Sequence, residues 1–128
     1  SLTIDSVSAL ASVYTEDAWF KDPFNEVRGL RELERVFRHM FQQVHDPRFV
    51  VTRTVAAGDD AFLTWDFLFR LHGSRDREQV IRGATHIQFA PDGRVAYHRD
   101  YWDAAEELYE KLPVLGGLMR FVKRRAAG

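Results

Sequence analysis

The spacing of apolar residues changes once along this chain, and that change limits the fold more than any other feature. From Gly29 to Val44 the apolar side chains recur at i, i+3 and i+4, which is typical of an amphipathic helix. From Arg48 onward they alternate with polar residues, which is typical of β-strands. Helices followed by consecutive strands predict an α+β domain, with an antiparallel sheet that carries helices on one face.

Turn residues divide the alternating half into four predicted strands. We expect these strands over 48–56, 61–71, 80–89 and 94–102, with a polar loop over 72–78. A shorter extended stretch is expected at 19–21. Further helices are predicted at 4–14 and, from a capping box that starts at Asp103, through Leu112. A chain of 128 residues fits one domain, over 1–128.

Composition excludes several classes of function. Cysteine is absent, so disulfides, thiol catalysis and thiolate metal ligands are excluded. The formal net charge of −1 provides no general attraction to nucleic acid or to an anionic membrane. No apolar run reaches the roughly 20 residues of a membrane helix, and no signal-peptide pattern opens the chain. We expect a cytoplasmic domain that binds neither nucleic acid nor membrane, with no cofactor and, lacking a ligand motif, no metal.

The last predicted strand carries the most chemistry. Alternation places His98, Asp100 and Trp102 on one face, with same-side neighbours about 6–7 Å apart. Burial of a carboxyl group in an apolar concavity disfavours its charged form, so such a group can exchange protons near neutral pH. Asp100 is therefore a candidate catalytic acid or base. The alternative is a structural ion pair with Arg70 or Arg82.

Two other carboxyl groups are candidates for a second catalytic residue. Asp22 precedes Pro23, where an aspartate commonly accepts backbone hydrogen bonds in a turn, so a turn role competes with a role as base. Asp66 shares a strand face with Leu68 and Arg70. It either points into a polar pocket or pairs with a basic residue across the sheet.

The opposite strand faces are also apolar, and we expect them to form the outer side of the sheet. Their aromatic residues are Trp65, Phe67, Phe69, Tyr97 and Tyr101. An outer apolar face needs a cover, which predicts a homodimer through that face. The basic C-terminal segment over 118–125 is predicted to pack as a helix beside the pocket or the dimer. Its charge is too local for a nucleic-acid arm.

Three segments, taken in order, resemble the nuclear transport factor 2-like superfamily, in particular its SnoaL-like and ketosteroid-isomerase-like branch. They are Tyr14–Phe24, with the pattern Tyr-x-x-Asp-Ala…Asp-Pro-Phe, then Val27–Gly29, then Phe89–Val95 followed by His98–Asp103. The resemblance implies a cone-shaped curved antiparallel sheet around a pocket, closed by N-terminal helices, with a C-terminal helix. It implies less about activity, because this fold hosts isomerases, hydrolases, cyclases and binding proteins.

Residue by residue, the resemblance places Asp22 where ketosteroid isomerases keep their general-base aspartate. It places Tyr14 and Trp102 at aromatic pocket positions of the same enzymes. Thr85 stands where those enzymes have a protonated carboxylic acid in the oxyanion hole, and a threonine can still donate a hydrogen bond. The chain starts near the family's second helix. The first helix, which carries the other oxyanion donor, is therefore expected to be missing.

The last strand is also similar to that of limonene epoxide hydrolases, in which Arg-Asp-Tyr-Phe-Asp carries one catalytic aspartate. This similarity places Asp100 in a catalytic position. The partner Arg-x-Asp of those enzymes would fall near Asp66, where the sequence reads Thr64-Trp65-Asp66-Phe67-Leu68 and has no arginine. The sequence therefore lacks the complete catalytic set of either enzyme.

Together these features predict a protein with a pocket for a small hydrophobic ligand of polyketide or steroid type. As an isomerase or hydrolase, it would use Asp100 as the principal acid or base and Asp22 or Asp66 as the second carboxyl group. The predicted ligand-binding residues are Tyr14, Trp19, Leu68, Thr85, His98 and Trp102. The alternative is a non-catalytic ligand-binding or dimerisation module of the same fold, in which the aspartates are structural partners.

Overall fold

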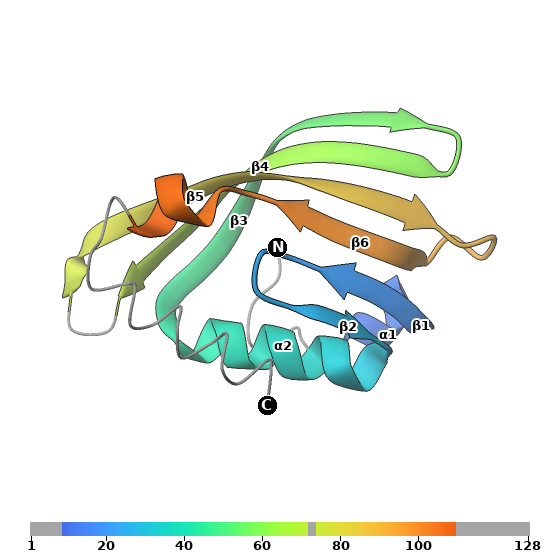
Figure 1. Cartoon of the computed structure of the whole chain (residues 1–128), viewed down its shortest axis with the longest axis horizontal. Coiled ribbons are helices and arrows are strands. Elements are labelled where there is room, and N and C mark those ends of the chain that lie inside the picture. The colour runs from blue at the N-terminus through green and yellow to red at the C-terminus, as the bar shows by residue number, and fades with distance from the viewer. Residues whose placement is uncertain (1–8, 72–73, 110–128) are drawn as a thin grey trace.

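One curved sheet and a few helices make up the domain. The computed structural model describes residues 9–71 and 74–109. Its elements are α1 (Leu10–Val13), β1 (Tyr14–Lys21), β2 (Glu26–Arg28), α2 (Leu30–Gln42), β3 (Val44–Ala57), β4 (Asp60–Leu71), β5 (Ser74–Phe89), β6 (Val95–Tyr101) and the π-helical η2 (Ala105–Tyr109). The strand order is β2-β1-β6-β5-β4-β3, and α2 lies along the inner side of the curve (Figure 1). The α+β class is confirmed.

The pairing of the strands shows one departure from expectation. Strands β3 to β6 pair antiparallel with their neighbours in the chain, as predicted. Strand β1 instead pairs in parallel with β6, and the short β2 pairs antiparallel with β1 at the edge. The sheet is therefore mixed. The reason is topological: after β2 the chain crosses along α2 to the far edge of the sheet, so the first and last long strands become neighbours.

Several elements extend beyond their predicted bounds. Strand β1 begins at Tyr14, whereas only residues 19–21 were expected to be extended. The predicted loop over 72–78 is largely strand, since β5 begins at Ser74 and pairs Glu78 with Arg70. Ladder hydrogen bonds to β4 continue there despite the polar composition. The helix expected at 4–14 ends at Val13. Its start, the chain beyond Tyr109 and the basic segment lie outside the described residues.

The core fills the space between α2 and the sheet. Helix α2 buries one stripe at helical spacing, formed by Leu33, Val36, Phe37 and Phe41. Its outer side carries the ion pair between Glu34 and Arg38, 3.2 Å apart. Burial of each large apolar side chain contributes about 1.5–3 kcal/mol. Within the described part of the chain, no helix is long and apolar enough to cross a membrane.

The aromatic face of β4 points inward, and this corrects the prediction that it lies outside. The three rings are almost wholly buried: Trp65 is 5 % exposed, Phe67 7 % and Phe69 2 %. Alternation defines two faces without saying which is concave. The register decides this, because directly paired residues share a face. Thr85 pairs with Asp100 on one side and with Leu63 on the other. Trp65, two residues after Leu63, therefore shares the face of Asp100.

Candidate functional site

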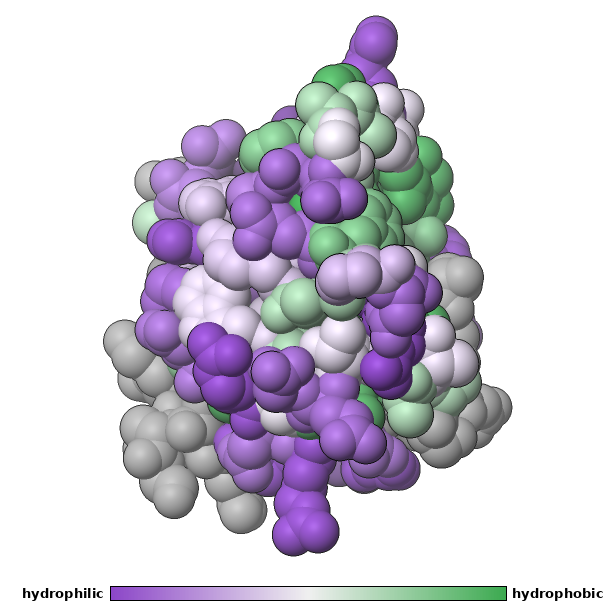
Figure 2. Space-filling view, turned by 90° about the vertical axis from the view of Figure 1, so that its right-hand side faces the viewer, coloured by the Kyte–Doolittle hydropathy of each residue, from purple (hydrophilic) through white to green (hydrophobic). Residues whose placement is uncertain are grey.

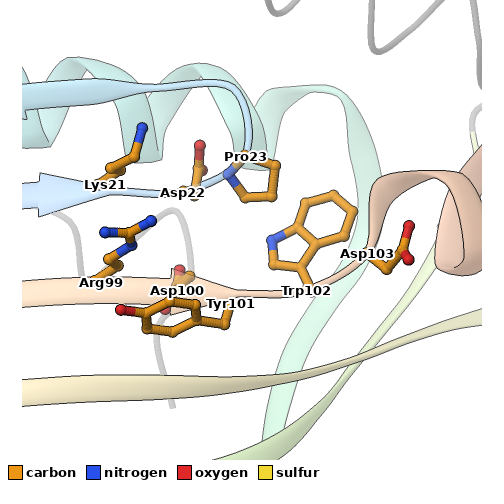
Figure 3. A pocket seen from close by; sticks show the side chains of 8 residues that line it. All are labelled: Lys21, Asp22, Pro23, Arg99, Asp100, Tyr101, Trp102 and Asp103. Carbon is orange, nitrogen blue, oxygen red and sulfur yellow. The ribbon is translucent and has the colours of Figure 1, made fainter.

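A cavity of about 560 Å³ opens where β1 ends and β6 continues (Figure 3). Its lining consists of Lys21, Asp22, Pro23, Arg99, Asp100, Tyr101, Trp102 and Asp103. Strand β1 last pairs with β6 at Lys21 and Arg99. Pro23 then prevents further regular pairing because it has no backbone N–H. The chain turns away, and this turn leaves room beside the last residues of β6.

Asp22 occupies one side of this cavity and is only 5 % exposed. Its Oδ1 accepts the backbone N–H groups of Phe24 at 2.8 Å and Asn25 at 2.7 Å. The side-chain amide of Asn25 donates to both carboxyl oxygens, at 3.1 and 3.2 Å. This is the turn expected from Asp-Pro. Asp22 is also one of the residues that line the cavity, so its part in the turn is compatible with its place in the candidate site.

The surroundings of Asp22 change the pKa of its carboxyl group. Burial raises its pKa to about 6. The hydrogen bond from Phe24 opposes this rise, the negative charge of Asp100 adds to it, and the hydrogen bonds from Asn25 again oppose it. Asp22 therefore passes between its charged and neutral forms close to physiological pH.

Asp100 lies at the centre of a chain of hydrogen bonds on the inner face of the sheet. Thr85 Oγ1 donates to Oδ1 of Asp100 at 2.6 Å, and Nε2 of His98 lies 2.7 Å from the same oxygen. Trp65 Nε1 donates to Thr85 Oγ1 at 2.7 Å, and the Tyr14 hydroxyl lies 2.7 Å from His98 Nδ1. With the imidazole proton on Nε2, the hydroxyl, imidazole and indole donors of this network all point toward Asp100.

Aromatic rings enclose His98 behind Asp100. Tyr14 stacks on the imidazole with ring centroids 5.9 Å apart, and Phe20 meets it edge-on at 4.9 Å. Burial, and secondly the charge of Asp100, raise the pKa of the Tyr14 hydroxyl. The hydroxyl therefore keeps its proton over the physiological range and remains a donor to this chain of hydrogen bonds.

Cationic and aromatic groups stand at the rim of the cavity. The Arg99 guanidinium lies over the Tyr101 ring, 4.7 Å from its centroid. Lys21 Nζ is 3.6 Å from a carboxyl oxygen of Glu26. Trp102 closes another side and packs against Phe24, with ring centroids 5.7 Å apart. The wall is therefore partly apolar. Of its three aspartates, Asp22 is buried, Asp100 is half-buried and Asp103 is exposed.

The structure brings most of the predicted site residues together. Asp22, Asp100 and Trp102 line the cavity, while Thr85, His98 and Tyr14 stand behind Asp100. Within residues 9–71 and 74–109, neither Asp22 nor Asp100 forms an ion pair with an arginine. The arginines proposed as partners are engaged elsewhere: Arg82 binds Glu107, and Arg70 lies near Asp46 and Glu78.

Three predicted site residues lie on the outer face of the sheet instead. Asp66 pairs across the strands with Arg82 and Val50, and Leu68 shares its face. The indole of Trp19 stacks on Tyr97 at 4.8 Å and donates to Glu26 at 3.2 Å. Each of the three is next in sequence to an inward-facing residue, so an error of one position in assigning the face moves it out of the site.

Sequence reasoning missed two polar partners of the site. Asn25 binds both oxygens of Asp22, and its place three residues after the aspartate of Asp22-Pro23 was an available signal. Trp65 supports Thr85, and only the strand register could have revealed this. Thr85 also differs from the expected oxyanion donor, because its hydroxyl proton is directed to Asp100. In the described part of the chain, no three His, Cys, Asp or Glu side chains are grouped to hold a metal ion.

The curved sheet, the helix along its inner side and the cavity at one end define a cone domain of the NTF2-like class. A family model for the SnoaL-like domain matches residues 3–98. The chain therefore belongs to the SnoaL-like family, which confirms the resemblance seen in its sequence. Among curated proteins, no sequence matches the chain.

Solved structures with the same fold include proteins of different description. A hypothetical protein with a ketosteroid isomerase-like fold from Catenulispora acidiphila DSM 44928, in complex with trimethylamine, has a TM-score of 0.72 at 14 % identity, covering 80 % of this chain and 79 % of that one. A candidate SnoaL-like polyketide cyclase from Jannaschia sp. CCS1 has a TM-score of 0.70 at 14 % identity, covering 80 % and 76 %. An LEH-like epoxide hydrolase from M. tuberculosis has a TM-score of 0.69 at 20 % identity, covering 94 % and 86 %. At these identities the likeness establishes the fold alone.

Proposed function

We propose that this chain is an enzyme that moves protons on a small hydrophobic molecule of polyketide or steroid type, in an isomerisation or ring closure. The observation that carries this proposal is that Asp22 and Asp100 line one cavity in different surroundings. Asp22 is buried with a pKa of about 6, whereas Asp100 is held by hydrogen-bond donors. Two carboxyl groups in different environments are suited to different roles in proton transfer.

In this reaction, ionised Asp22 acts as the base. It removes a proton from a carbon next to a carbonyl group: the C–H bond breaks, an O–H bond forms on Asp22, and the electron pair moves to the carbonyl oxygen. Neutral Asp22 then returns the proton to another carbon. The pKa near 6 supports both steps, because neither form is strongly favoured near neutral pH. Asp100 orients a hydroxyl group of the substrate, and Trp102 contributes an apolar wall.

The geometry favours proton transfer on carbon over epoxide hydrolysis. The hydrolase template needs a carboxyl group from the strand of Asp66, directed into the pocket. Here Asp66 lies on the outer face, and the inward position beside it is taken by Trp65. A non-catalytic binding module would make structural ion pairs of its aspartates. Asp22 and Asp100 instead share a cavity, with no arginine bound to either among the described residues.

A general probe of carboxylate bases tests the proposal. 5-Nitrobenzisoxazole opens to the coloured 2-cyano-4-nitrophenolate when a base removes its ring C–H proton and its N–O bond breaks. We expect turnover that falls about 100-fold or more in Asp22→Asn. It should fall less in Asp100→Asn, because loss of the neighbouring negative charge lowers the pKa of Asp22 and makes it a weaker base. Asp59→Asn, an exposed aspartate between β3 and β4 that does not line the cavity, is the matched control and should stay near wild type. Equal rates in all four proteins would instead support the non-catalytic module.

We also propose that the outer face of the sheet forms a homodimer, in a protein of the cytoplasm. A row of rings crosses this face: Phe62 stacks on His86 at 4.3 Å, His86 meets Tyr97 at 5.0 Å, and Tyr97 stacks on Trp19. Phe62 is 53 % exposed. Figure 2 shows hydrophobic residues gathered in the upper part of the molecule, level with the β3–β4 hairpin of Figure 1. A second copy offers a self-complementary cover for such a surface.

A further inference from the structure

Three neighbouring strands each contribute one residue to a short line of buried hydrogen bonds. Trp65 on β4 donates to Thr85 on β5 at 2.7 Å, and Thr85 donates to Asp100 on β6 at 2.6 Å. Trp65 is 5 % exposed and Thr85 3 %. Little water reaches the two donors, so neither has an alternative partner in solvent. Under such conditions a hydrogen bond fixes geometry more firmly than it does at the surface.

A glycine makes this line possible. Gly83 pairs directly with Trp65 across the two strands. A Cβ atom at position 83 would lie 2.5 Å from two carbon atoms of the indole. Non-bonded carbon atoms pack at about 3.5–4.0 Å, so any other residue would displace the ring. The space above Gly83 lets the indole lie across β5 and reach Thr85, the next residue that points inward.

The line ends on one particular oxygen of Asp100. Thr85 and His98 both bond to Oδ1. Within the described residues Oδ2 accepts no hydrogen bond, and Asp100 is one of the residues that line the cavity. Bonds to Oδ1 from two sides restrict rotation of the carboxyl group. One oxygen is thus held by the protein, and the other remains for a ligand.

We propose that Gly83, Trp65 and Thr85 form a positioning arm that orients Asp100 and presents its Oδ2 to the ligand. None of the three is a catalytic residue, because each acts through Asp100. The effect on turnover rests on the proton-transfer function proposed above. The hydrogen-bond coupling between Trp65, Thr85 and Asp100 does not depend on that function. The positioning arm and the proposed function can therefore be refuted independently.

The coupling can be measured without a substrate. The chain has three tryptophans, so ¹⁵N-labelled protein shows three indole N–H signals, and Trp65→Phe identifies the one from Trp65. We expect this signal to shift in Thr85→Val and in Asp100→Asn, and its hydrogen exchange to accelerate about tenfold or more. Thr85→Ser should restore it. Thr64→Val, an exposed threonine on β4, is the matched control and should leave it unchanged.

A second kind of variant disturbs the arm by steric contact alone, without altering any polar group. Gly83→Ala should displace the indole and reproduce the altered Trp65 signal, with the other two indole signals reporting an intact fold. With 5-nitrobenzisoxazole as the probe, Thr85→Val should lower kcat by up to about tenfold at nearly constant KM, because the released Asp100 carboxylate no longer holds its charge beside Asp22, whose strength as a base depends on that charge. Thr85→Ser should stay close to wild type. If the shift and hydrogen exchange of the Trp65 indole signal are unchanged in Thr85→Val, the positioning arm is refuted.

The outcomes separate the two proposals. Suppose that Asp100→Asn turns over 5-nitrobenzisoxazole more slowly than wild type, while Thr85→Val and Thr85→Ser both keep the wild-type kcat. The arm then does not position Asp100, and the proposed function stands. If Asp22→Asn and Asp100→Asn both turn over the probe like wild type, the proposed function fails. In that case the Trp65 signal still decides whether the arm holds Asp100.

Discussion

Nε2 of His98 lies 2.7 Å from Oδ1 of Asp100, although only one residue separates the two on β6. Residues at i and i+2 of a strand point to the same side, which places the two groups within reach. Their side chains are 13 % and 16 % exposed, so water screens the contact less than it screens a surface pair. The other ring nitrogen of His98, Nδ1, lies 2.7 Å from the Tyr14 hydroxyl, so the imidazole links Asp100 to Tyr14 by hydrogen bonds.

The raised pKa of Asp22 predicts that stability falls as the pH rises through the weakly acidic range. The ordinary pKa is 3.8 and the folded value is about 6. Between these values the folded chain holds a proton that the unfolded chain has released, so ionisation opposes folding. This group should lower the free energy of unfolding by up to about 3 kcal/mol between pH 4 and pH 7. Urea unfolding at several pH values measures the slope.

Asp22→Asn should remove that slope, because its side chain cannot ionise. The amide keeps an oxygen that can accept the N–H groups of Phe24 and Asn25, so the turn should survive. The exposed Asp59→Asn serves as control and should retain the wild-type slope. An unchanged slope in Asp22→Asn would assign the pH dependence to other groups.

Asp100→Asn should lower the pKa of Asp22, because one cause of its rise is the negative charge of Asp100. The same change should lower the pKa of Tyr14, for which that charge is the second cause after burial. A ¹³C NMR titration of the Asp22 carboxyl carbon measures the first effect. Asp103→Asn removes a carboxylate from the same cavity that is not among those causes, and should leave the titration unchanged. Equal shifts in the two variants would contradict a specific coupling.

Phe41→Ala should destabilise the fold by about 3–5 kcal/mol, the usual result of removing a buried aromatic ring. Phe41 is 0 % exposed, and its ring centroid lies 6.5 Å from that of Phe37 and 6.5 Å from that of Phe67. Urea unfolding measures the loss. Val13→Ala on α1, where the side chain is 48 % exposed, should change stability by less than about 1 kcal/mol. Similar values for the two would contradict the proposed position of the core.

Phe62→Glu should convert a dimer into a monomer with unchanged secondary structure, because it places a charge in the row of rings on the outer face. Sedimentation velocity measures the assembly state, and circular dichroism checks the fold. Glu34→Lys, on the solvent side of α2, changes charge without touching the sheet and should leave the dimer intact. Wild-type protein that sediments as a monomer at high concentration would refute the dimer.

Local features of the site were predictable wherever neighbours in sequence create them. The turn at Asp22 follows from Asp-Pro, and Asp103 caps the start of η2, with the Glu106 N–H donating to its carboxyl group at 3.1 Å. The common face of His98 and Asp100 follows from strand alternation. By contrast, the parallel pairing of β1 with β6 depends on where the chain lies after crossing along α2, and no local pattern encodes that.

The helical stripe of α2, the alternation of the later strands and the family of the chain follow from the order of its residues alone. The side of each strand that faces the core follows only from the contacts of the folded sheet. Alternation shows that Trp65 and Asp66 lie on opposite faces of β4, but it does not show which of these faces packs against the core. The register of β4 against β5 and β6 breaks that symmetry through contacts between residues distant in sequence. For this reason Trp65 supports Asp100 from within, and Asp66 lies on the outer face.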